Sequence, residues 1–303
     1  MISDKEIVCP NNLLDVAHKK KGVNAGIVNA GKPLPMLSVM DAVKEELIIP
    51  TFIGDKKEIE KCANDLKFDI SKFDIVNEPD ENSTAKAAAK LASKNKIKII
   101  VKGHIHTDVL MKEVIKKEYN LIGKTRLSHI WHMTLDKEDK PLIITDGALN
   151  VLPNVKTKMH ILKNVVNFSN RIGIDKPKVA VLSATEEVLD SVQSSLDAKE
   201  ITELALEEKI NADVFGPLAF DNSVSKKSAA IKGIKNLVAG QADVLLVPSV
   251  ETGNALVKMM IYFMGACAAG VVVGGKVPVV ITSRSDEAQA RLASIAAAVV
   301  ALD

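Results

Sequence analysis

The segment Ser283–Asp286, with the sequence SRSD, places a hydroxyl, a guanidinium and a carboxylate within four residues. It follows the apolar run VPVVIT and precedes a helical pattern, so we expect it at a strand-to-helix turn, with Ser285 as the N-cap. Arg284 is one of only four arginines among 40 basic residues. A guanidinium binds phosphate oxygens in pairs and stays charged, so Arg284 suits a phosphate, but a surface arginine beside a capped helix fits the same spacing equally well.

Histidines form a second cluster, because four of the six lie between His104 and His132. They occur in GHIHTD (103–108) and RLSHIWHM (126–133). A zinc site has to be considered. However, no further carboxylate or cysteine stands at a recognisable ligand spacing, so we expect loop or core histidines and no metal.

Further candidates follow other predicted strands, because ligands of open α/β sheets bind beyond the carboxyl ends of strands. The loops in question are KGHIHTD (102–108), DGALN (146–150), GPLAFD (216–221) and PSVETGN (248–254). Glycine and proline there would permit close approach of the backbone to a ligand. Ordinary turns need the same residue types, so this interpretation stays open at the level of residue pattern.

The elements that must position these residues alternate between short β-branched runs and helical patterns. Strands are predicted at 25–29, 48–55, 73–77 and 97–103, with helices between them and at 107–119. The segment 123–140 breaks the rhythm. A second series follows, with a helix over 155–172, and the last strand and helix end the chain. This pattern predicts an α/β fold with mostly parallel sheets and helices on both faces. We expect two lobes, residues 1–140 plus 276–303 and residues 141–275.

Composition narrows the class of protein. A net charge of +2 in 303 residues offers no footprint for nucleic acid. Three distant cysteines favour a reducing compartment. The N-terminus lacks a signal-peptide pattern, and the most apolar stretch is broken by glycines, Lys276 and Pro278, so we expect a soluble, cytoplasmic protein without membrane contact. Neither a P-loop nor a GxGxxG follows any predicted strand.

Several segments together resemble the phosphate acetyltransferase and phosphate butyryltransferase family. They include VKGHIHTDVLMKEV, RLSHIWHM, LIITDGALNVLPN, ADVFGPLAFDNSVS, AGQADVLLVPSVETGNALVK and PVVITSRSDE, in order from about Gly22 onward. The resemblance implies a two-lobe fold related to isocitrate and isopropylmalate dehydrogenases, with a cleft between the lobes. The SRSD spacing and the histidine segments resemble the butyryl-like branch and the acyltransferase lobe of hydratase fusions more closely, and we expect no added hydratase domain.

The resemblance implies the reaction acyl-CoA plus phosphate giving acyl phosphate plus CoA, with acetyl or butyryl as the acyl group. It implies that Ser283, Arg284 and Asp286 are catalytic. The implied substrate-binding residues are Lys102, Gly103, His104, Thr107, Ser128, Asp146, Gly216, Pro217, Glu251, Thr252, Gly253 and Asn254. Coenzyme A enters as a substrate rather than as a bound cofactor. The partners expected are these small molecules and a second copy of the chain, as a homodimer or a higher homo-oligomer.

A mechanism follows from the roles that the resemblance implies. Asp286 would take the proton of the CoA thiol, and Arg284 and Ser283 would hold the negative charge on phosphate and carbonyl oxygens, so that both substrates react directly. Three alternatives stay open: a β-decarboxylating-dehydrogenase-like oxidoreductase on the same fold, a hinged ligand-binding protein and a histidine-dependent metallohydrolase.

Overall fold

The computed structural model describes residues 2–136, 140–282 and 286–302, and these form two compact units. The terminal unit comprises Lys5–Lys124, Asp136–Glu138 and Cys267–Asp303. The central unit comprises Met1–Asp4, Thr125–Leu135 and Asp139–Ala266. Compared with the expected lobes, residues 125–135 thus go with the central unit and residues 267–275 with the terminal one.

The sheet of the terminal unit has the strand order β3-β2-β1-β4-β11-β10. Its strands are β1 (Val23–Val28), β2 (Ile48–Gly54), β3 (Ile75–Asn77), β4 (Ile99–Lys102), β10 (Cys267–Val273) and β11 (Val279–Val280). All neighbours pair in parallel except β10 and β11. The last strand of the chain therefore lies between β10, which directly precedes it in sequence, and β4, which is distant in sequence.

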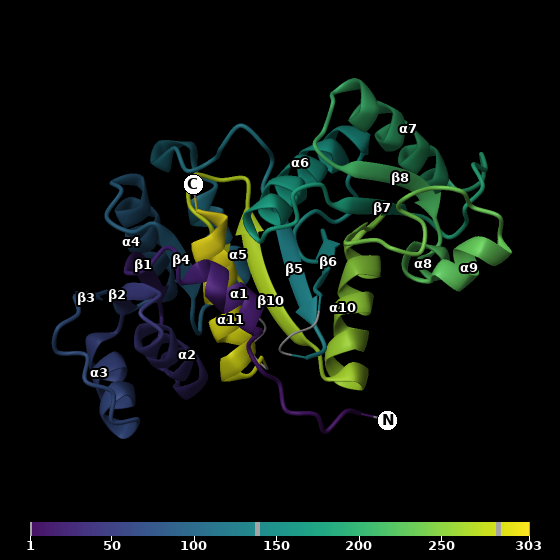
Figure 1. Ribbon diagram of the computed structural model, residues 1–303. Helices are drawn as coiled ribbons and strands as arrows, with labels where there is room; N and C mark the ends of the chain where they lie inside the picture. Colours follow the sequence, from purple (N-terminus) through teal and green to yellow (C-terminus); the bar gives the residue numbers. More distant parts are fainter. Residues whose placement is uncertain (1, 137–139, 283–285, 303) are drawn as a thin grey trace. The chain divides into compact units, whose positions relative to one another are not determined.

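Helices cover both faces of this sheet (Figure 1). They are α1 (Asn11–Ala17), α2 (Pro33–Lys44), α3 (Lys56–Asp65), α4 (Glu81–Ser93), α5 (Thr107–Val114) and α11 (Ala288–Ala301), with a 3-10 turn at Lys117–Tyr119. Helix α11 packs against β10 and β11 and also contacts α1 and α2, whereas α4 contacts β1, β2 and α5. Every residue from Ala290 to Val300 is buried, because small alanine side chains let α11 lie close to the sheet.

The central unit contains a five-stranded sheet in the order β5-β6-β9-β7-β8. The strands are β5 (Ser128–Thr134), β6 (Leu142–Thr145), β7 (Lys178–Leu182), β8 (Asp213–Leu218) and β9 (Val244–Leu246). Only the β5–β6 pair is antiparallel. The helices are α6 (Val155–Arg171), α7 (Gln193–Glu207), α8 (Phe220–Val224), α9 (Lys226–Ile231) and α10 (Val250–Met264).

The mostly parallel α/β architecture confirms the sequence prediction, but three local expectations are wrong. The segment that was expected only to break the rhythm contains β5, in which every residue is buried. Helix α10 begins at Val250, inside the segment 248–254 that was expected to be a loop, because Ser249 caps it. Helix α11 begins at Ala288 with Glu287 at the N-cap, whereas Ser285 was expected there.

Among the described residues, no helix combines the length and the apolar character needed to cross a membrane.

Candidate active site

In the terminal unit, the predicted residues after β4 lie at the carboxyl edge of the sheet. Lys102 ends β4 and is 4% exposed, and Gly103 follows it directly. The Gly103 amide donates to the Val28 carbonyl over 2.8 Å, and the His104 amide donates to the Asn29 carbonyl over 2.8 Å. The Asn29 side-chain amide donates back to the His104 carbonyl over 2.7 Å. The loops after β1 and β4 are therefore locked together.

This locking depends on the small size of Gly103. A Cβ at this position would approach the Val28 carbonyl oxygen to 2.5 Å and would also collide with that of Asn29. Asn29 itself has a φ of 59°, a left-handed conformation that asparagine tolerates better than most residues. Sequence analysis did not single out Asn29, although it ends the predicted strand 25–29 and the rule of strand ends could have found it.

The two remaining residues of this loop, His104 and Thr107, have exposed side chains, and Thr107 is the first residue of α5. His106 precedes it and pairs with Glu81, with 2.9 Å between its Nδ1 and the nearer carboxylate oxygen. The predicted Lys102, His104 and Thr107 thus lie along one short segment, with a buried amine at its start and two exposed polar groups after it.

The strand that precedes SRSD, β11, ends at the same edge of the sheet. Val280 of β11 pairs in parallel with Val101 of β4, so Lys102, which ends β4, and Thr282, two residues after β11, belong to the same ends of neighbouring strands. Ser283 and Arg284, together with the predicted N-cap Ser285, lie outside the described residues. Asp286 is half-buried. Burial, followed by the charge of Asp286, raises the pKa of the Cys267 thiol to about 12. Asp286 therefore acts electrostatically on the inside of the terminal unit.

In the central unit, Asp146 organises the DGALN loop. Its carboxylate is 2% exposed. One oxygen accepts the amides of Ala148 and Leu149 over 3.0 and 2.9 Å. The other accepts the amides of His129 and Asn150 over 3.1 and 3.3 Å and the Asn150 side chain over 2.7 Å. Five donors occupy this carboxylate, which suits an organising role better than direct contact with a substrate.

The DGALN loop touches the ETGN segment through bare backbone. Gly147 and Gly253 face each other so closely that a Cβ at Gly253 would lie 2.6 Å from the Gly147 Cα. The side-chain amide of Asn254 lies 3.5 Å from the Gly147 carbonyl oxygen, toward which it points. Since β6 and β9 are parallel neighbours, both segments leave the sheet at one edge. The structure thus brings Asp146 and Glu251–Asn254 together.

We expected the segment Glu251–Asn254 to be a loop, but it forms the first turn of α10. The Ser249 hydroxyl caps the Thr252 amide over 3.5 Å. Glu251 and Asn254 have exposed side chains, whereas Gly253 is buried. Glu251 adds a carboxylate to the positive end of the helix dipole, where it is stabilised.

The remaining predicted residues of the central unit, Ser128, Gly216 and Pro217, are buried. Ser128 is fully buried, and its hydroxyl accepts the side-chain amide of Asn164 over 2.8 Å. Gly216 and Pro217 lie within β8 instead of in the loop after it, and they are joined by a cis peptide bond. A Cβ at Gly216 would lie 2.6 Å from the Val181 carbonyl oxygen, so glycine is needed there for strand packing.

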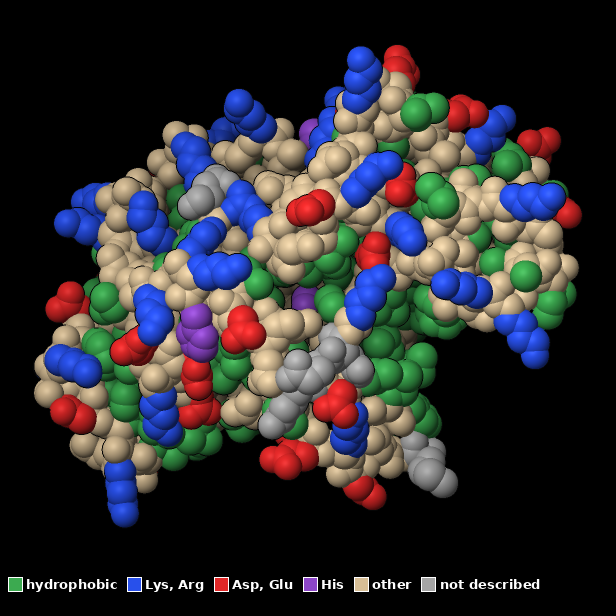
Figure 2. Space-filling model, viewed as in Figure 1, with side chains coloured by type: hydrophobic (Ala, Val, Ile, Leu, Met, Phe, Trp, Pro, Cys, Tyr) green, Lys and Arg blue, Asp and Glu red, His purple; other side chains and the backbone are tan. Residues whose placement is uncertain are grey.

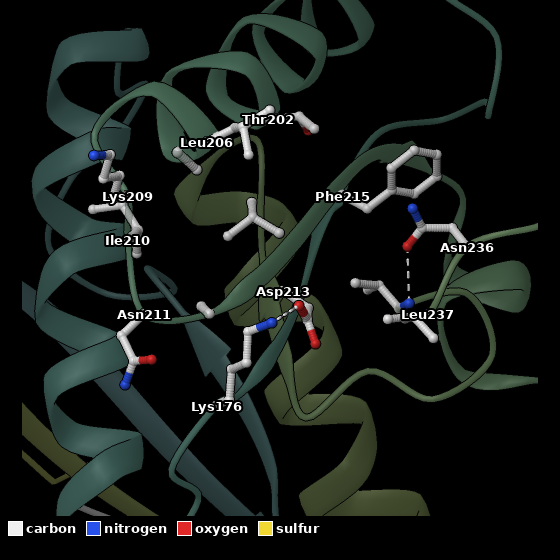
Figure 3. A pocket seen from close by; sticks show the side chains of 14 residues that line it. Lys176, Thr202, Leu206, Lys209, Ile210, Asn211, Asp213, Phe215, Asn236 and Leu237 are labelled. Carbon is white, nitrogen blue, oxygen red and sulfur yellow. Dashed lines mark hydrogen bonds and ion pairs between the residues drawn. The ribbon is translucent and has the colours of Figure 1, made fainter.

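A pocket of about 550 Å³ lies elsewhere in the central unit, beside the first half of the edge strand β8. Lys176 and Asp213, which both line it, form an ion pair with 2.5 Å between Nζ and Oδ1. Figure 3 shows this pair, with Leu206 of α7 and Leu237 on opposite sides of the view. None of the predicted site residues lines it. We therefore do not assign the substrates to this pocket.

The histidines occupy the loop and core positions that were expected. His104 and His106 are exposed in the loop after β4, and His129 and His132 are buried in β5. Burial lowers the pKa of His132 to about 4, so its imidazole is neutral at pH 7. Within the part of the chain that the structure describes, no group of three or more histidine, cysteine, aspartate or glutamate side chains could hold a metal ion.

Comparison with known proteins now adds to this geometry. Residues 80–299 match the protein family described as "Phosphate acetyl/butaryl transferase". The chain belongs to this family. It is 38% identical to a phosphate acetyltransferase of Rickettsia typhi over 285 residues, and this match covers 93% of this chain and 82% of that protein. It is also similar to the crystal structure of a branched-chain phosphotransacylase from Enterococcus faecalis, with 33% identity, a TM-score of 0.81 and coverage of 92% and 98% of the two chains.

Family membership confirms the function indicated by the sequence segments: the chain is a phosphate acetyl- or butyryltransferase, an acyltransferase enzyme. The expected fold class is confirmed too. A 4-hydroxythreonine-4-phosphate dehydrogenase from Salmonella typhimurium shares the fold over 92% of this chain, with a TM-score of 0.60 and 14% identity. Phosphotransacylases and such dehydrogenases therefore share one α/β framework, and here the family match decides for the transferase.

Proposed function

We propose that this transferase moves a short acyl group, acetyl or butyryl, directly between coenzyme A and inorganic phosphate. The observation that carries this proposal is the family match over residues 80–299, because that range includes SRSD and all four strand-end segments described above. Two substrates held side by side can react without a covalent acyl-enzyme, since positioning alone supplies a large part of the rate enhancement.

In the proposed step, a phosphate oxygen attacks the thioester carbonyl carbon and forms the new C–O bond. The C–S bond then breaks, and CoA leaves as a thiolate that takes up a proton. Negative charge gathers on the carbonyl oxygen and the phosphate, and we assign Arg284 and Ser283 to hold it. In the reverse direction Asp286 takes the proton of the CoA thiol, whose ordinary pKa of about 8.5 leaves it mostly protonated at pH 7.

The segments at the two sheet edges are proposed to bind the substrates. Lys102, Gly103, His104 and Thr107 follow β4, beside the strand that leads into SRSD, and the buried cation of Lys102 suits an anionic group there. In the central unit, Glu251–Asn254 and the segment at Gly216 and Pro217 complete the set. We propose that Ser128 and Asp146 position other site residues and do not contact the substrates, because their side-chain oxygens accept hydrogen bonds from Asn164 and Asn150 within the central unit.

The decisive experiment measures CoA release from acetyl-CoA and from butyryl-CoA, with and without phosphate, on protein treated with a chelator. We expect phosphate-dependent release that needs no added metal or cofactor, and the better substrate names the acyl group. Arg284→Ala should lower turnover about 10² to 10³-fold, as the loss of one charge-stabilising donor does. Arg171→Ala is the matched control, since Arg171 lies at the end of α6 and its Nε donates to the Asn167 side-chain oxygen over 3.0 Å, apart from the proposed site residues. Release that ignores phosphate would refute the proposal.

We also propose that a second copy of the chain covers an apolar face of the central unit. Met259, Tyr262, Phe263 and Met264 on α10 are 39–59% exposed, and Phe220 and Val224 of α8 are similarly exposed. Figure 2 shows hydrophobic side chains gathered around these helices. Sedimentation should give a dimer or larger assembly that Phe263→Glu weakens, while Leu206→Glu, on α7, should leave it intact. A monomeric wild-type protein would overturn this assignment.

A further inference from the structure

The loop that follows DGALN displays two large apolar side chains to solvent. Val151 is 64% exposed and Leu152 is 81% exposed. Their neighbours in the sequence, Asn150 and Pro153, are buried. Turns usually carry polar residues, and apolar side chains exposed singly need no explanation. Two in succession make a continuous apolar surface, which is typical of a place where another molecule is contacted.

The backbone that carries this pair is fixed on both sides. Before it, the Asn150 amide and side chain both donate to the Asp146 carboxylate, over 3.3 and 2.7 Å. After it, the Asn154 side chain caps the first turn of α6. The Val151 carbonyl itself accepts the Val250 amide over 2.9 Å. The two side chains therefore stand on an ordered loop, so a ligand that contacts them loses little free energy to ordering of the protein.

The pair lies beside the proposed substrate segments of the central unit. Val250, which bonds Val151, is the first residue of α10 and directly precedes Glu251. DGALN and the first turn of α10 also meet where Gly147 faces Gly253. The Glu251 side chain is exposed. One edge of the central sheet thus presents polar groups of α10 next to the apolar pair of the loop before α6.

The chemistry of the substrates indicates what the apolar pair contacts. Phosphate is wholly polar, and so is the nucleotide end of coenzyme A with its phosphate groups. The pantetheine arm alternates amides with short hydrocarbon segments. The acyl chain is the one part that is hydrocarbon throughout, and it ends at a thioester carbonyl that needs polar partners. Sites for small molecules combine apolar surface with a few placed polar groups in this way.

We infer that Val151 and Leu152 contact the acyl chain of acyl-CoA and set the preference of the enzyme for chain length. The inference rests on the proposed acyl transfer and on the proposed binding of substrates at this edge. Burial of one CH2 group improves binding about fourfold, so the two CH2 groups that distinguish butyryl from acetyl account for a difference of about 15-fold. Loss of the apolar contact therefore affects butyryl-CoA more than acetyl-CoA.

The test measures kcat/KM for acetyl-, propionyl- and butyryl-CoA at saturating phosphate. Leu152→Ala and Leu152→Asn should lower the ratio of kcat/KM for butyryl-CoA to that for acetyl-CoA by about 4- to 15-fold, with propionyl-CoA between them. Val151→Thr, which replaces a methyl group by a hydroxyl of similar size, should lower it about two- to fourfold. Leu206→Ala is the matched control, because Leu206 is 82% exposed on α7 and lies outside the proposed site, so the ratio should stay at the wild-type value.

The KM for phosphate and the thermal midpoint should change little in all these variants, because the altered side chains are exposed. Equal losses with all three acyl-CoA substrates would overturn the inference, since they would indicate contact with coenzyme A itself or a general disturbance of the loop. Dissociation of the assembly in sedimentation of Leu152→Ala would also overturn it and make the pair a contact between copies of the chain. If the wild-type protein shows no phosphate-dependent CoA release with any acyl group, the proposed function fails and this inference falls with it, whereas an unchanged ratio in active variants refutes the inference alone.

Discussion

The contact between Gly147 and Gly253 gives the sharpest test of how the central unit holds its motifs. In Gly253→Ala the new Cβ would stand 2.6 Å from the Gly147 Cα, 3.0 Å from the Val247 Cγ2 and 3.1 Å from the Gly147 amide nitrogen. Ordinary van der Waals contact begins at 3.4 Å, so the two segments must separate by about 0.8 Å. The clash with Gly147 cannot be relieved by rotating a side chain, because the atoms that the new Cβ meets there are backbone atoms.

The magnitude follows from two opposing effects. Overpacking of this kind costs about 1–3 kcal/mol. Alanine is a better helix former than glycine by about 1 kcal/mol, which offsets part of that cost. We expect the free energy of unfolding to fall by up to about 2 kcal/mol. The separation also moves Glu251 and Asn254 relative to the DGALN loop, so kcat/KM should fall on the order of 10- to 100-fold.

The assay is CoA release in the presence of phosphate, together with urea unfolding of the same samples. Gly147→Ala should behave alike, because its Cβ would meet the Gly253 carbonyl carbon at 2.9 Å. The two changes together should cost less than their sum, since one separation accommodates both. Gly233→Ala is the control: its φ of +67° makes alanine unfavourable by about 1 kcal/mol, but nothing lies within 4 Å. Normal activity and stability in Gly253→Ala would refute the reasoning.

Three further predictions concern other parts of the molecule. Gly103→Ala should lower both activity and the thermal midpoint, because its Cβ would lie 2.5 Å from the Val28 carbonyl oxygen; Gly173→Ala, with nothing within 4 Å, should keep full activity per folded molecule. Asp146→Asn should lower the free energy of unfolding, measured in urea, by about 3 kcal/mol, since five donors lose a charged acceptor. Asp190 is exposed, so Asp190→Asn should change this free energy little, and an equal loss in both variants would contradict the argument. His132 should make the protein less stable as pH falls from about 6.5 to about 4, because the unfolded chain binds the proton and the folded chain, with its pKa at about 4, does not. This loss in the free energy of unfolding should approach about 3 kcal/mol and should be absent from His132→Gln. If His132→Gln shows the same pH dependence of stability as the wild type, His132 is not its cause.

The regular elements could be predicted because their sequences are locally consistent. Helix α6 was expected over 155–172 and is observed over Val155–Arg171, since Asn154 caps the Thr157 amide and a periodic apolar face follows. Strand β4 was expected from an unbroken β-branched run. Strand β5 was missed because two histidines and a tryptophan obscure its apolar character, and its burial comes from packing that no local pattern records.

The candidate site was predictable in location more than in detail. Chain order and the rule of strand ends found Lys102, Asp146 and Gly253. Sequence alone could not indicate that the Asp146 carboxylate turns inward, because that depends on how its own loop folds back on it and on where the His129 amide of β5 arrives. Val151 and Leu152 were not singled out, since apolar residues beside a predicted helix are normally buried and their exposure is visible only in the structure.

The order of strands in the terminal unit has a consequence for how the protein is made. The terminal unit contains β1 to β4 from the first part of the chain and β10, β11 and α11 from its last part. These last elements leave the ribosome only after the whole central unit has been synthesised. Until then β4 exposes the edge that β11 later covers. Because domains generally fold as units during synthesis, we expect the central unit, largely contiguous in sequence, to complete its fold first. Chains released before about residue 280 would carry an open sheet edge and would be substrates for chaperones or for aggregation.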